Sequence, residues 1–112
     1  MKKPVIYMFV LVSFMVSSVA SAGSWHNSDI KRIYPIADGA FIVTFKTDHA
    51  DCKSGSSPKT FYVKVGESGV TQEAQDKMYS LVLAAAMSGK KVQVNFETVS
   101  SSCFVNRMLV EF

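Results

Sequence analysis

The hydrophobic and polar positions of the chain divide it into two parts. Residues 5–19 are almost wholly apolar, whereas after residue 22 apolar and polar positions alternate in several segments. Alternation with a period of two is typical of half-buried β-strands, and residues 30–36 and 40–47 both show it. The turn residues between these two segments, 37–39, predict a β-hairpin.

The rest of the pattern predicts one helix and three more strands. Residues 60–65, 91–97 and 104–112 alternate like the first two strands, and the polar segment 48–59 is expected to be a loop. Residues 72–88 have the periodicity of an amphipathic helix. Together these elements give the order β-β-β-α-β-β.

The predicted helix has signals at both ends and a broad apolar face. Thr71 suits an N-cap, Glu73 places a negative charge in the first turn, and Gly89 suits the C-terminal end. The apolar positions cover an arc of about 160°, more than the roughly 100° that one core requires, so part of the face is a candidate for self-association. The residues of this face are Met78, Tyr79, Leu81, Val82, Leu83, Ala85 and Ala86.

The first 22 residues have the pattern of a cleavable signal peptide. Lys2 and Lys3 precede the apolar run, and Ala20-Ser21-Ala22 provides the small residues of a peptidase site. The run is shorter than the roughly 20 residues that span a bilayer as a helix. We therefore predict cleavage after Ala22, export to the periplasm or the medium, and a single domain over residues 23–112.

Removal of the signal peptide changes the charge and the role expected of the cysteines. It leaves ten basic and nine acidic residues, and this balance gives no support for nucleic-acid binding. Cys52 and Cys103 are expected to form a disulfide in an oxidising compartment. The bridge would close a loop of about 50 residues and stabilise the domain by about 4 kcal/mol.

Three strands, a helix and two strands are the element order of the OB-fold, a small Greek-key barrel. In that barrel the loops after the second and fourth strands lie at the same end, which suits a bridge between Cys52 and Cys103. An α+β sheet with one packed helix uses the same elements and is the alternative.

Several landmarks resemble those of a group of small exported bacterial proteins of unassigned function. Residues 79–96, a helix ending in Ser-Gly-Lys before a valine-rich strand, are also similar in layout to the binding subunits of pentameric bacterial toxins such as subtilase cytotoxin. The second resemblance implies an OB-fold that binds cell-surface glycans and assembles as a ring with helices at its centre. The landmarks are Ile33-Tyr34, Asp38-Gly39, Pro58-Lys59, Gly69-Val70-Thr71, Ser88-Gly89-Lys90 and Cys103 through Asn106-Arg107.

The first three predicted strands have an outer face with aromatic and basic residues. OB-folds bind extended ligands on such faces, aromatic rings stack on sugar rings, and Lys or Arg pairs with acidic sugars. A saccharide is therefore the favoured ligand of an exported domain, and an ordinary solvated sheet face is the alternative. The predicted ligand face consists of Arg32, Tyr34, Thr44, Lys46, Tyr62 and Lys64.

Other polar residues are expected to be structural. Asp48, His49 and Asp51 are interpreted as a solvated loop rather than a metal site, and Trp25 with His26 as a tail or a docked flap. No metal or cofactor is expected.

Asn106 and Arg107 lie between apolar residues of the last predicted strand. We expect Arg107 to be partly buried and to require a carboxylate partner such as Glu97 or Asp51.

The sequence lacks the motif of a serine hydrolase, and Asp38 and Glu97 lie where turns and strand ends commonly place charges. We therefore expect a non-enzymatic binding module, with a saccharide ligand and homo-oligomeric assembly. The alternative is a structural or inhibitor-like envelope protein that acts through protein contacts.

Overall fold

The structure is a computed structural model that describes residues 23–112, so the predicted signal peptide and its cleavage site lie outside the described residues. Within residues 23–112, no helix has the length and apolar character needed to cross a membrane. The elements are β1 (Ser24–Ser28), β2 (Ile30–Pro35), β3 (Phe41–Phe45), β4 (Phe61–Val63), α1 (Gln72–Ser88), β5 (Val92–Phe96) and β6 (Val105–Leu109).

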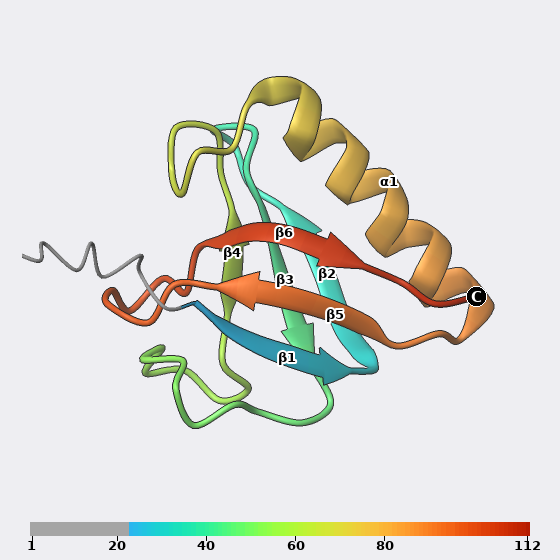
Figure 1. The fold of residues 1–112 in the computed structure, drawn as a ribbon, viewed down its shortest axis with the longest axis horizontal. Helices are drawn as coiled ribbons and strands as arrows, with labels where there is room; N and C mark the ends of the chain where they lie inside the picture. Colours follow the sequence, from blue (N-terminus) through green and yellow to red (C-terminus); the bar gives the residue numbers. More distant parts are fainter. Residues whose placement is uncertain (1–22) are drawn as a thin grey trace, which may run out of the picture.

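The strands form two antiparallel three-stranded sheets that cross each other (Figure 1). The front sheet has the order β1-β5-β6, and the rear sheet is the meander β2-β3-β4. The Tyr62 N–H donates to the carbonyl oxygen of Ser102 at 3.2 Å, which joins β4 to the segment before β6. These pairings make the OB-like barrel that the element order predicts, rather than one sheet with a packed helix.

The structure has one strand more than the sequence pattern predicts, because residues 24–28 form β1 ahead of the predicted strand at 30–36. Trp25 and His26, which the sequence suggests to be a tail or a docked flap, are part of β1, which pairs with β5. The inward residues of β1, His26 and Ser28, are polar because they bind the loop after β3: Ser28 Oγ lies 2.8 Å from the Thr47 hydroxyl. Buried and exposed side chains alternate along β1, but a hydrophobicity pattern does not show this because the buried residues are polar.

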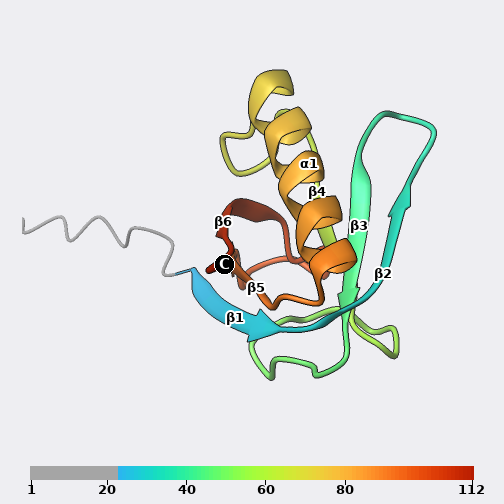
Figure 2. The ribbon, with the colours of Figure 1, turned by 90° about the vertical axis from the view of Figure 1, so that its right-hand side faces the viewer.

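The predicted helix is confirmed at both ends. The Thr71 hydroxyl accepts the Ala74 N–H at 3.1 Å, and Gly89 adopts the left-handed conformation at φ 70°. The helix packs against β2 and β6 and covers the space between the two sheets at one end (Figure 2). The largest fully buried side chains beneath it include Phe41, Phe45, Phe61 and Phe96.

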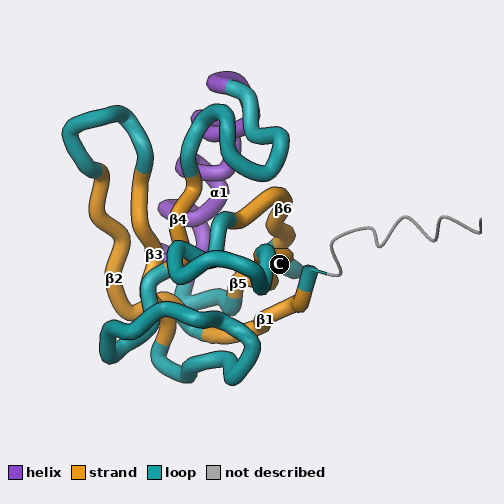
Figure 3. The backbone as a smooth tube through the Cα atoms, turned by 90° about the vertical axis from the view of Figure 1, so that its left-hand side faces the viewer, coloured by secondary structure: helices purple, strands orange, loops and turns teal. Residues whose placement is uncertain are grey.

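The disulfide between Cys52 and Cys103 is present, and both residues are buried. It joins the loop after β3 to the loop between β5 and β6. Both loops lie on the side of the barrel that faces the viewer in Figure 3. The bridge therefore connects the end of the rear sheet to the end of the front sheet, as the sequence analysis expects.

Candidate functional site

The predicted ligand face is the outer face of the rear sheet, where the register brings two tyrosines together. Tyr34 on β2 and Tyr62 on β4 are both paired with Ile42 of β3, and Arg32 is paired with Thr44. Side chains in such cross-strand pairs have Cβ atoms about 5 Å apart. An aromatic pair thus flanks the central strand.

Three residues of this face are less available than predicted. Tyr62 is half-buried with its ring against Phe104, and the Lys64 ammonium lies 3.4 Å from Asp38. Thr44 was expected to be exposed but is 1% exposed, because it is a short side chain on the central strand. Its hydroxyl has no hydrogen-bond partner among residues 23–112. The exposed residues of the face are Arg32, Tyr34 and Lys46.

The prediction for Arg107 is wrong. Arg107 is exposed, and its Nε donates to Asn106 Oδ1 at 3.3 Å rather than to a carboxylate. The cause is a bulge in β6, where Phe96 pairs with Val105 but Asn95 pairs with Arg107. The extra residue changes which face the following side chains occupy.

The two carboxylates considered for catalysis stabilise turns. The Ala40 N–H and then the Lys64 ammonium hold the pKa of Asp38 below its ordinary value. Burial alone would raise the pKa of Glu97, but hydrogen bonds from Ser100 and two other backbone N–H groups outweigh it and lower the pKa. Both groups are therefore ionised acceptors near neutral pH.

The predicted apolar face of α1 divides into a buried and an exposed part. Met78, Val82 and Ala85 are buried in the core, and Tyr79 and Leu81 are half-buried. The exposed residues are Leu83, Ala86 and, beyond the predicted set, Met87, which is 89% exposed.

The acidic and histidine side chains after β3 have structural partners. Asp48 accepts the Lys59 N–H at 3.1 Å, Asp51 accepts the Ser24 hydroxyl at 2.6 Å, and His49 Nδ1 accepts the Asp51 N–H at 3.0 Å. Within residues 23–112, no group of three or more His, Cys, Asp or Glu side chains is arranged to hold a metal.

The outer face of the front sheet carries polar and aromatic residues that the sequence analysis did not group. Trp25 is 44% exposed, whereas Asn95 is 8% exposed because Gly23 packs directly against it. Cross-strand pairing arranges these residues in two neighbouring rows. The rows are Trp25-Asn95-Arg107 and Asn27-Gln93-Leu109.

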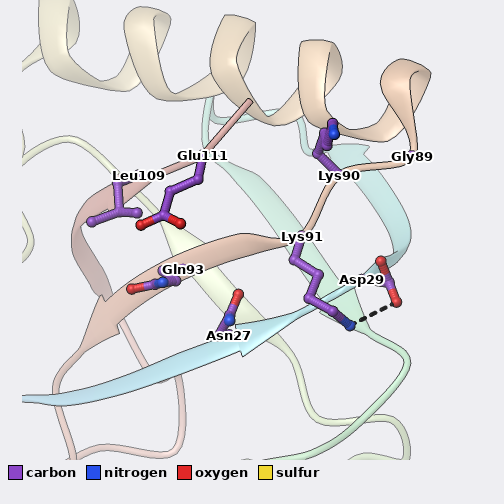
Figure 4. Close-up of a pocket in the computed structure, with 8 residues that line it drawn as sticks. All are labelled: Asn27, Asp29, Gly89, Lys90, Lys91, Gln93, Leu109 and Glu111. Carbon is purple, nitrogen blue, oxygen red and sulfur yellow. Dashed lines mark hydrogen bonds and ion pairs between the residues drawn. The ribbon is translucent and has the colours of Figure 1, made fainter.

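A pocket of about 340 Å³ lies beside the second row, close to the C-terminal end of α1 (Figure 4). The amides of Asn27 and Gln93 lie on neighbouring strands at its floor. The Lys91 ammonium lies 3.1 Å from the Asp29 carboxylate at one end, and Leu109 lines the other. The remaining lining residues are Gly89, Lys90 and Glu111.

The chemistry of this pocket is that of a hydrogen-bonding site. An amide both donates and accepts, a lysine donates and a carboxylate accepts, so the lining can satisfy a ligand with several hydroxyl groups. Its volume is at the lower end of the range of small-molecule pockets. The signal that would have found it is the alternation of Trp25, Asn27 and Asp29 beside that of Gln93 and Asn95.

Comparison with known proteins gives one kind of match. No family model and no curated protein sequence matches the chain. A solved structure, the cholera toxin-like B-subunit from Citrobacter freundii, superposes with a TM-score of 0.60 at 16% identity, covering 80% of this chain and 87% of that chain. The expected resemblance in architecture to toxin B-subunits is thereby confirmed at the level of the fold.

Proposed function

We propose that the protein is an exported, non-enzymatic module that binds a saccharide on the outer face of the front sheet. The observation that carries the proposal is the polar pocket in which Asn27 and Gln93 lie side by side. The exposed Trp25 is two residues from Asn27 along β1 and on the same face of the sheet. The toxin B-subunit fold and the disulfide are consistent with a binding role outside the cytoplasm.

The front sheet supports a saccharide better than the face predicted from sequence. On the rear sheet, Lys64 is paired with Asp38, Tyr62 is half-buried and Thr44 is buried, so only Arg32, Tyr34 and Lys46 of the six predicted residues are exposed. On the front sheet, an exposed tryptophan and two amides share one surface. Aromatic faces stack on sugar rings and amides pair with hydroxyls.

We also propose that copies of the chain associate through the exposed side of α1. Leu83 and Met87 are one helical turn apart, and both are exposed apolar side chains. A second copy that covers them would remove apolar area from water.

A glycan array with the mature protein, residues 23–112, tests the saccharide proposal. We expect bound glycans whose signal falls when Asn27 and Gln93 are changed to alanine together. The matched control is Tyr34→Ala on the rear sheet, which should leave the signal unchanged. An array without any bound glycan, together with a protein captured from the cell envelope, would instead favour a structural or inhibitor-like protein that acts through protein contacts.

A further inference from the structure

We infer that this site takes a neutral oligosaccharide of at least two rings, with one ring in the pocket and the adjoining ring on Trp25. The inference rests on the proposed function and adds to it the charge and the length of the ligand. Three observations carry it: the balance of charge in the pocket, the hydrogen-bonding groups of its floor, and the position of Trp25.

The charges that line the pocket cancel. Asp29 and Glu111 oppose Lys90 and Lys91, and the Lys91 ammonium is already 3.1 Å from Asp29. An acidic sugar would have to compete with Asp29 for Lys91 and would lie near the Glu111 carboxylate. The pocket therefore offers no net attraction to an anion, in contrast to an arginine-rich acidic-sugar site.

The floor of the pocket suits neutral hydroxyl groups. Asn27 and Gln93 are directly paired on β1 and β5, so their amides present donors and acceptors from two neighbouring strands. Leu109, paired with Gln93 on β6, extends this row with an apolar side chain, which suits the C–H face of a sugar ring. A pyranose uses both kinds of surface at once.

Trp25 is placed to receive the next ring. It precedes Asn27 by two residues on β1, so both side chains are on the same face at a separation of about 6.6 Å along the strand. Trp25 is 44% exposed, which is high for a large apolar side chain that could otherwise pack in the core. A ligand that fills the pocket and continues along β1 therefore reaches the indole.

Arg107 is the charged residue in the row of Trp25. It is in the same row as Trp25 but on β6, two strands away, which corresponds to about 9.6 Å between strand axes. Its Nε atom is engaged by Asn106. The second ring therefore rests on the indole rather than on the guanidinium.

Calorimetric titration of the mature protein with defined sugars tests the inference. The probes are glucose, cellobiose and cellotriose, galactose and lactose, mannose and mannobiose, and galacturonate oligomers of matched length. We expect a neutral disaccharide to bind about tenfold more tightly than its monosaccharide, the contribution of one stacked ring. The galacturonate oligomers should bind no better than the neutral sugars.

Variants of Trp25 test whether the indole provides the tenfold gain in disaccharide affinity over monosaccharide affinity. Trp25→Ala should remove the tenfold gain but leave monosaccharide affinity unchanged, Trp25→Phe should retain most of the gain, and Tyr34→Ala should have no effect. Tighter binding of the acidic oligomers, or an equal loss of mono- and disaccharide affinity in Trp25→Ala, would overturn the inference while leaving saccharide binding intact. Absence of binding to every sugar here and on the array would overturn the proposed function itself.

Discussion

The Nε2 atom of His26 donates a hydrogen bond of 2.7 Å to the carbonyl oxygen of Thr47. This contact attaches β1 to the beginning of the loop after β3. The imidazole is parallel to the ring of Phe61, with ring centroids 5.8 Å apart, and it is 6% exposed. A titratable group therefore lies between the two sheets.

We predict that acidification weakens the fold through His26. Burial lowers the pKa of His26, and this effect outweighs the opposing hydrogen bond to Thr47. The folded protein then holds a neutral imidazole while the unfolded chain takes up a proton near pH 6.5. The free energy of unfolding should be highest above pH 6.5 and should fall as the pH decreases through the folded-state pKa, because the unfolded state binds more protons.

Urea unfolding at a series of pH values measures this dependence. In His26→Gln, which cannot titrate, the slope between about pH 7.5 and 5.5 should become shallower. An identical slope in both proteins would assign the pH dependence to other groups.

A second prediction concerns the loop between β5 and β6. The Glu97 carboxylate accepts the backbone N–H groups of Val99, Ser100 and Phe104 at 2.9 to 3.1 Å and also the Ser100 hydroxyl. Glu97→Gln should lower the free energy of unfolding by about 2 to 3 kcal/mol, because an amide group would face donors that lose their acceptor. Glu111→Gln, at an exposed position, is the control and should change it little.

We also predict a loss of stability at acid pH through protonation of Glu97. Its pKa is lowered from 4.5, so its contribution is complete above that pH and is lost as the pH falls through the folded-state pKa. Denaturation midpoints measured below about pH 4.5 should therefore decrease in the native sequence and change less in Glu97→Gln.

Removal of one buried hydroxyl should stabilise the domain. The Thr44 hydroxyl has no partner among residues 23–112, and valine has nearly the same shape, so Thr44→Val should raise the free energy of unfolding by about 1 kcal/mol. Thr47→Val is the contrasting variant, because the Thr47 hydroxyl donates to Ser28 Oγ at 2.8 Å, and it should be destabilising. Thermal unfolding of the pair would contradict this account if Thr44→Val were the less stable protein.

Self-association through α1 predicts a change in mass. The double variant Leu83→Lys, Met87→Lys should keep its helix content but sediment as a monomer at micromolar concentration, whereas the native sequence should sediment as an oligomer. Gln72→Lys in the first turn is the control for added charge. If the native sequence sedimented as a monomer, the proposed self-association through α1 would be wrong.

Local sequence signals predict the ends of the helix better than they predict which face of a strand each side chain occupies. Thr71 and Gly89 define the ends of α1 through backbone hydrogen bonds and a left-handed φ, and both effects depend on single residues. The orientation of Arg107 depends instead on a bulge against Asn95, which involves two strands. No pattern within one strand contains that information.

The candidate site shows the same limit. Trp25 and Asn27 alternate with the polar residues His26 and Ser28, and a strand with polar residues on both faces resembles a loop in sequence. Gln93 becomes a neighbour of Asn27 through the pairing of β1 with β5, far apart in the chain. The disulfide, in contrast, was predicted correctly because it requires only two cysteines and an oxidising compartment.

The Cys52–Cys103 bridge also determines what a protease can release. The two cysteines are 51 positions apart, and the segment between them includes β4, α1 and β5. A single cut anywhere in that segment leaves two fragments that are still covalently linked. Nicked protein would therefore migrate as one species on a gel without reductant and as two when reduced. The N-terminal fragment would carry β1 and the C-terminal fragment β6, the two outer strands of the front sheet.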